Sequence, residues 1–170
     1  MTRKKKTIIW IAVIVVLVGG FLALRIPSWN QTYGLPEDVI AGERIPTAEE
    51  TIRLYFYHWN RLNDNQGDSL LTDELTKEIQ IHDENYFISR ILGGIKSVVK
   101  WFLEDEKIAS IDTWTEESEE VDVNRAEFLV DSYSGYLWEK KGNSYLTVYE
   151  LVRENTTSPW RINSFGDGSP

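Results

Sequence analysis

Few residues of this sequence combine the types and spacings that chemistry requires. His82, Asp83 and Glu84 are adjacent in the chain, whereas two metal ligands on one helix face are separated by three or four residues. Residues 116–122 include five carboxylates, which could attract Ca²⁺ weakly, although acidic turns are usually only solvated. Neither a glycine-rich phosphate loop nor a Ser/His/Asp constellation is present. We therefore predict no catalytic residue, no cofactor and no metal site.

The most informative pattern is the apolar segment 7–26. Residues 7–24 carry no charge, and as an α-helix they would span about 27 Å, close to the hydrocarbon thickness of a bilayer. Four cations precede the segment and only Arg25 follows it, so the positive-inside rule places residues 1–6 in the cytoplasm. Residues 27–170 would then lie outside. The expected anchor residues at the two interfaces are Lys6, Trp10, Arg25 and Trp29, with Tyr33 in the same outer aromatic belt.

A cleaved signal peptide also begins with basic residues and an apolar run. The length of this run, and the absence of a small-x-small pattern before Arg25, favour an uncleaved signal-anchor. The sequence does not establish whether the anchor is ever cleaved.

The charge of the chain is unevenly distributed. All 27 acidic residues but only 13 of the 18 basic residues follow residue 26, which gives this part a formal charge of −14. Such a surface repels nucleic acid and favours cationic partners or simple solubility. The chain has no cysteine, so packing alone must hold the domain together.

Helical patterns dominate the first half of the outer chain. Residues 27–46 contain three prolines and two glycines and are predicted to be a linker over the membrane surface or the domain. A capping box, Thr47 to Glu50, opens an amphipathic helix that should end near residues 63–65. A turn and a second helix over residues 68–79 follow. Leu54 and Tyr57 lie opposite the apolar face and could pack on the linker or on a partner.

The pattern then becomes ambiguous before it changes to β. Residues 84–92 favour a helix, whereas residues 95–103 fit a helix or a strand. Four segments rich in β-branched and aromatic residues are predicted strands, with a bulge between Val123 and Ala126. Helices followed by an antiparallel meander predict an α+β domain in which a curved sheet packs on two to three helices. The predicted strands are residues 108–115, 121–133, 145–153 and 160–165.

These features resemble the nuclear transport factor 2-like superfamily, whose cone-shaped α+β fold is also called cystatin-like. The resemblance covers residues 47–168 and rests on the opening aromatic helix ETIRLYFYHWNRLND, the short helix GDSLLTDEL and the later hairpins. The ending SPWRINSFGDGSP is similar to that of bacterial exported or membrane-anchored proteins of unassigned function, mainly from Gram-positive organisms. The resemblance implies that Trp160 and Ile162 point inward from the last strand.

Enzymes with this cone-shaped fold hold an acid or a His–Asp pair in an apolar pocket, where it moves protons next to a carbonyl. The resemblance therefore implies a set of residues that would line the cavity. No two of them form a recognisable catalytic pair. The implied cavity-lining residues are Tyr55, His58, Trp59, Asp112, Asp131 and Trp160.

Three functions are consistent with the sequence. The favoured one is a membrane-anchored, extracytoplasmic, non-catalytic domain that binds an envelope protein, a peptide or a small ligand. The first alternative is a scaffold subunit of a secretion or conjugation complex, because the inner-membrane scaffold proteins of type IV secretion systems have a similar layout. The second is a cyclase- or isomerase-like enzyme, which rests on fold analogy alone. The oligomeric state stays open.

Overall fold

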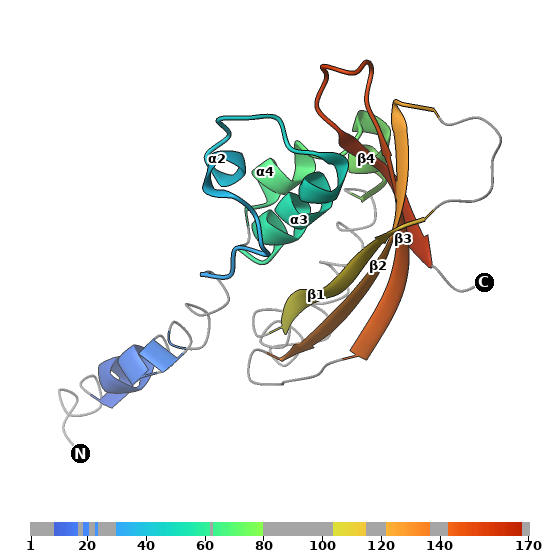
Figure 1. Ribbon diagram of the computed structural model, residues 1–170. Coiled ribbons are helices and arrows are strands. Elements are labelled where there is room, and N and C mark those ends of the chain that lie inside the picture. The colour runs from blue at the N-terminus through green and yellow to red at the C-terminus, as the bar shows by residue number, and fades with distance from the viewer. Residues whose placement is uncertain are drawn as a thin grey trace.

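The computed structural model describes residues 9–16, 19–20, 23, 30–61, 63–79, 104–114, 122–136 and 143–167. Three labelled helices precede four strands, and residues 73–79 are also helical. The helices lie on the same side of a curved sheet (Figure 1). The predicted order of helices and then antiparallel strands is thus confirmed. The elements are α2 (Glu37–Ile40), α3 (Ala48–Trp59), α4 (Asp64–Asp68), β1 (Glu104–Thr113), β2 (Arg125–Tyr136), β3 (Asn143–Val152) and β4 (Arg161–Asp167).

The predicted capping box begins α3. The side chain of Thr47 accepts a hydrogen bond from the backbone N–H of Glu50, and the Glu50 carboxylate accepts one from the N–H of Thr47 at 2.8 Å. These bonds satisfy two of the N–H groups left unpaired at a helix start. The helix ends at Trp59, about one turn before the predicted end, and the side chain of the next residue, Asn60, bonds to β1.

The predicted second helix is wrong as one continuous element. It is replaced by α4, by the helical residues 73–79, and by a short non-helical connection, residues 69–72, between them. Within that stretch Leu71 forms a parallel bridge with Ile162. The N–H of Ile162 donates to the carbonyl of Leu70 at 2.8 Å, and the N–H of Thr72 donates to the carbonyl of Ile162 at 2.9 Å. The backbone leaves the helical conformation here because it pairs with the outer edge of β4.

The four strands form one antiparallel sheet in the order β1-β2-β3-β4. The predicted bulge between Val123 and Ala126 is wrong, because β2 begins at Arg125 and stays in continuous register with β3. Val123 lies in the preceding turn. Register shifts occur instead in the β1–β2 pairing between Ile108 and Ser110, and in the β3–β4 pairing next to Leu151.

The core lies between the helices and the face of the sheet that carries Phe128 and Val130. Ile52 and Phe56 of α3 enter it from one side, and Leu151 and Ile162 from the other. The inward orientation predicted for Ile162 is therefore confirmed. The buried residues of this core are Tyr33, Ala48, Ile52, Phe56, Leu71, Leu75, Phe128, Val130, Tyr149, Leu151 and Ile162.

Residues 31–46, which we call the strap, contain α2 and pack against the back of α3. Leu35 and Val39 of the strap bury Leu54, as one of the two alternatives for this residue predicted. Tyr33 was expected in an outer aromatic belt, but its ring packs in the core near Phe56, and its hydroxyl donates to the carbonyl of Glu106. The strap is thus packed chain rather than a free spacer.

Residues 9–16 are helical, and their large apolar side chains are 41 to 72% exposed. Trp10 is among them. Within the described ranges no helix is both long enough and apolar enough to cross a bilayer. The predictions for Lys6, Arg25, Trp29 and residues 84–92 and 95–103 fall outside the described ranges.

Candidate binding surface

The two predicted aspartates lie on the face of the sheet away from the helices. Residues directly opposite in an antiparallel pair share a face, and side chains alternate along each strand. Asp112 pairs with Leu129, and Asp131 is two residues further along the same strand. Phe128 and Val130, which alternate along β2 with Leu129 and Asp131, point into the core. Asp112 and Asp131 therefore share the outer face, where Ser110 and Ser144 donate to their carboxylates at 3.1 and 2.8 Å.

His58 lies on the other side of the sheet, where α3 contacts α4. A Cβ placed on Gly67 of α4 would be 3.8 Å from the Cβ of His58. The imidazole is buried, it meets the Tyr57 ring edge-on at 5.2 Å, and its Nδ1 has no hydrogen-bond partner among the described residues. Burial, and then the nearby charge of Arg61, lower the pKa of His58. The structure does not bring His58 to either aspartate.

Three other predicted residues contribute aromatic rings. Tyr55 stacks on Trp59 with 6.1 Å between ring centroids, and it also lies 6.5 Å from Phe165 of β4. Phe165 in turn lies 5.5 Å from Tyr149 of β3. We call these four residues the aromatic row. Trp59 and Phe165 are 42% and 39% exposed, whereas Tyr149 is buried, so the row runs from the surface into the core. Trp160 lies apart from these contacts, partly buried beneath the guanidinium of Arg153 at 4.4 Å.

A polar junction that sequence reasoning missed joins the strap, α3 and β1. The side chain of Asn60 accepts from the N–H of Glu106 at 3.1 Å and donates to the carbonyl of the same residue. The hydroxyl of Tyr33 donates to that carbonyl at 2.8 Å, and Asn60 Nδ2 also donates to the Tyr33 hydroxyl oxygen. We call these three residues the Asn60 junction. The partners lie 27 and 46 residues from Asn60, so local spacing carries no signal of them.

Glu106 and Tyr149 are the interior titratable groups that sequence reasoning also missed. Glu106 opposes Ser134 in the β1–β2 register, on the helix-facing side, and Ser132 Oγ lies 3.5 Å from its carboxylate. Burial, the charge of Glu106 and then Tyr55 raise the pKa of Tyr149 well above its usual value. Tyr149 is therefore a neutral phenol at physiological pH. The phase of β1 relative to the core could have indicated Glu106, but the shift between Ile108 and Ser110 hides that phase.

Within the described ranges, no group of three or more His, Cys, Asp or Glu residues could hold a metal ion. The helix-facing side instead carries the aromatic row, which is partly exposed, and the Asn60 junction beside an apolar core. Aromatic rings with partly exposed faces can contact apolar groups, and they attract cations through the negative face of the ring. A net charge of −14 over residues 27–170 adds to that attraction.

The fold and this surface define a small α+β domain with an open antiparallel sheet and an aromatic helix-facing side. Residues 49–166 match the family described as "Domain of unknown function (DUF4829)". Because the match covers more than half of the 170 residues, the chain belongs to this family. No curated protein and no solved structure shows a significant match to the chain.

Proposed function

We propose that this chain is a single-pass membrane protein that displays an acidic, non-catalytic binding domain outside the cytoplasm of a bacterial cell. Membrane anchoring is supported by the exposed apolar side chains of the helical residues 9–16. Exposed apolar surface of this extent on a helix is costly in water and favourable in lipid. The four cations before this helix support the N-in orientation.

The architecture supports a nuclear transport factor 2-like fold for the domain. The helices lie on one face of an antiparallel sheet whose strands follow in chain order. The long opening helix α3 presents Ile52 and Phe56 to that face. This fold commonly places a ligand between the helices and the sheet, which is the side that carries the aromatic row.

The observation that carries the binding function is the aromatic row itself. Trp59 and Phe165 leave large parts of their rings exposed, although Tyr55 and Tyr149 continue the row into the core. Tryptophan and tyrosine dominate binding surfaces because they offer large rigid contact areas. The acidic charge of the domain favours a basic segment of an envelope protein or peptide as the partner.

A non-catalytic role is supported by the positions of the expected proton-transferring groups. A general base needs a partner within hydrogen-bond reach, but Asp112 and Asp131 lie on the opposite face of the sheet from α3, which carries His58. The scaffold alternative would use Leu54 and Tyr57, together with Gly19 and Ala23, as contact surfaces. Leu54 is instead buried by the strap, so the described structure favours the binding domain.

The membrane anchor is tested by alkaline extraction of membranes from cells that express the full chain. We expect the native protein to stay in the membrane pellet and its domain to be digested by protease added to intact cells stripped of wall. Replacing both Ile14 and Val15 by Lys should release the protein, because each Lys at a helix centre costs about 3 kcal/mol of insertion free energy. The control Ile45→Lys, also exposed, should stay in the pellet. Retention of the double variant would contradict the proposal.

The binding surface is tested with the full chain in lipid nanodiscs and a fluorescent ten-residue peptide of alternating Lys and Gly. We expect saturable binding that Trp59→Ala and Phe165→Ala each weaken by about fivefold, since a cation–π contact contributes about 1 kcal/mol. Trp114 is also partly exposed, at 37%, but it lies outside the aromatic row. Trp114→Ala is therefore the matched control. Equal weakening by all three changes, or no binding by the native chain, would contradict the proposal.

A further inference from the structure

We propose that the strap fixes the domain directly at the membrane surface, so that its partner must itself be membrane-proximal. This inference rests on the proposed membrane anchor. A chain of 20 residues between an anchor and a domain normally acts as a flexible tether. Here, contacts from Gln31 to Arg44 bind the strap to the domain, so most of these 20 residues cannot act as a tether.

The first contact that holds the strap is made by the turn at its start, residues 32–35. The N–H of Leu35 donates to the carbonyl of Thr32 at 3.0 Å, and both central residues, Tyr33 and Gly34, have left-handed φ values of 56° and 75°. An aromatic residue adopts this conformation only where its surroundings impose it. Tyr33 is held there by its buried ring and by the Asn60 junction.

Arginines of α3 and of the residues that follow it hold the backbone of this turn. Arg53 Nη1 donates to the carbonyl of Tyr33 at 3.1 Å, and Arg61 Nη1 donates to the carbonyl of Gln31 at 3.2 Å. Arg53 is itself oriented by Glu49, one helical turn earlier, at 2.7 Å. The strap is therefore bound to the domain from its first residue onward.

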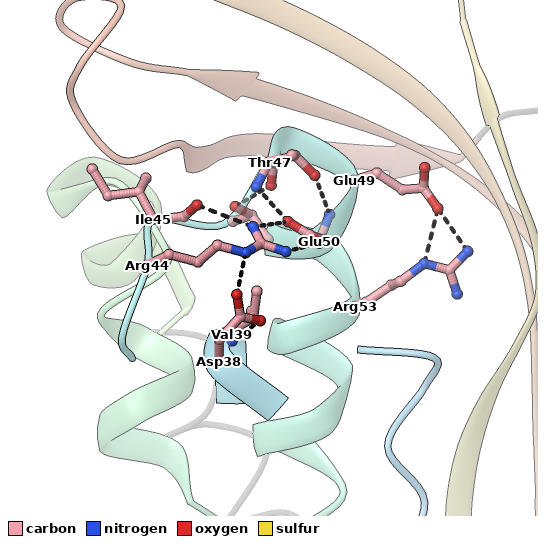
Figure 2. Close-up of polar contacts among 9 residues, drawn as sticks. Asp38, Val39, Arg44, Ile45, Thr47, Glu49, Glu50 and Arg53 are labelled. Carbon is pink, nitrogen blue, oxygen red and sulfur yellow. Dashed lines mark hydrogen bonds and ion pairs between the residues drawn. The ribbon is translucent and has the colours of Figure 1, made fainter. Parts of the chain in front are cut away.

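The far end of the strap is fastened by Arg44 (Figure 2). Its guanidinium donates to both carboxylate oxygens of Glu50, at 2.6 and 2.8 Å, and its Nε donates to Asp38 of α2 at 2.8 Å. Leu35 and Val39 fill the space between these two fastenings against Leu54. Polar contacts at both ends and apolar packing in the middle leave no free length inside the strap.

The remaining free length is short. The predicted anchor ends at Ile26 and the first bound residue is Gln31, so only residues 27–30 separate them, and four residues reach at most about 14 Å. A free linker over residues 27–46 would instead reach about 70 Å when extended and about 25 Å on average. The attachment point of the domain is thus held within about 14 Å of the membrane, and a partner must reach a domain that stays at the membrane surface.

Hydrogen exchange of the full chain in nanodiscs tests the strap itself. We expect slow exchange at the amides of Leu35 and Ala41, which donate to Thr32 and Glu37. The double change Tyr33→Ala and Leu35→Ala should accelerate strap exchange at least tenfold while the β2–β3 amides stay protected. The control Ile45→Ala, an exposed strap position, should change nothing. Exchange of the native strap at the rate of unstructured chain would overturn the inference.

Energy transfer to the membrane tests the distance. The chain has no cysteine, so Asn65→Cys, at an exposed position after Arg61, can carry a donor in vesicles of phosphatidylcholine and phosphatidylglycerol with a rhodamine lipid. Inserting ten Gly/Ser residues between Asn30 and Gln31 should lower the transfer at least twofold. Unchanged transfer would overturn the inference. A chain that fails to float with the vesicles would instead refute the membrane anchor and leave the exchange result standing.

Discussion

The side chain of Asn60 pairs with both backbone polar groups of Glu106, in the manner of a neighbouring strand. It accepts from the N–H at 3.1 Å and donates to the carbonyl. Within the described ranges β1 is an outer strand of the sheet, so Asn60 takes the place that a further strand would occupy at Glu106. Asn60, the residue directly after α3, therefore bonds to the edge of the sheet at Glu106 and holds the end of the helix against β1.

Asn60→Ala should destabilise the domain strongly. The change removes the bonds from Asn60 to the backbone of Glu106 and to the hydroxyl of Tyr33, and each such hydrogen bond contributes about 0.5–1.5 kcal/mol. We expect a loss of about 3 kcal/mol in the free energy of unfolding, measured by urea titration with tryptophan fluorescence. Asn63→Ala removes an exposed bond to Gln66 and should cost under about 0.5 kcal/mol. Similar losses for both changes would argue against the Asn60 junction.

Acid should weaken the start of α3 through Glu50. The Arg44 guanidinium, and then the bonds from Thr47, lower the pKa of Glu50 to about 2 from 4.5. Its contribution is therefore complete above pH 4.5 and is lost as the pH falls through 2. Because the pair is partly exposed, we expect about 1 kcal/mol in total.

Urea titrations at pH 5 and pH 3 measure this contribution. Glu50→Gln should reduce stability at pH 5 and make it less sensitive to acid. Glu49→Gln, which removes the neighbouring ion pair with Arg53 and leaves the bonds of Glu50 in place, is the control. An unchanged acid dependence in Glu50→Gln would show that Arg44 does not hold the Glu50 carboxylate.

Stability should also decline below pH 6.5 because of His58. Burial, with Arg61 as a second cause, lowers the pKa of this imidazole in the folded state. The unfolded chain then binds the proton more readily, so the contribution is present above pH 6.5 and is lost as the pH falls towards the folded-state pKa. We expect His58→Leu to flatten the stability profile between pH 7.5 and 5.5. A titration of His58 at pH 6.5 by NMR would contradict this prediction.

Two leucines of β3 should differ sharply when they are shortened to alanine. Leu151 is fully buried in the core, whereas Leu146 is 46% exposed on the outer face. Leu151→Ala should cost about 3 kcal/mol of unfolding free energy, the usual cost of a cavity. Leu146→Ala should cost less than about 0.5 kcal/mol. A larger loss for Leu146→Ala than for Leu151→Ala in urea titrations would mean that β3 presents the opposite face to the helices.

Local signals in the sequence predicted local structure well. The capping box at Thr47 and Glu50 was visible because both partners lie within four residues, and strand composition located β1 to β4 within a few residues. The face that each residue presents was harder to predict. Asp112 was chosen because its strand was expected to line the cavity, and the register shift between Ile108 and Ser110 changes the phase of β1, which hides from the sequence that Asp112 faces outward.

Contacts between distant segments were not predictable from spacing. Leu70, Leu71 and Thr72 fit a helix by their own pattern, but the backbone of β4 offers them hydrogen bonds that a helix would forgo. The buried position of Tyr33 depends on Asn60 and Glu106 in the same way. In each case a partner far along the chain overrides the local preference.

Each outer strand of the sheet has one position that another part of the domain already occupies. On β1 the amide of Asn60 takes the outward bonds of Glu106, and on β4 the backbone of Leu70 and Thr72 takes those of Ile162. A neighbouring copy cannot extend the sheet through either position without displacing these groups, and open strand edges are what templates fibrous aggregation. Strand addition by a second copy is therefore blocked at these two positions.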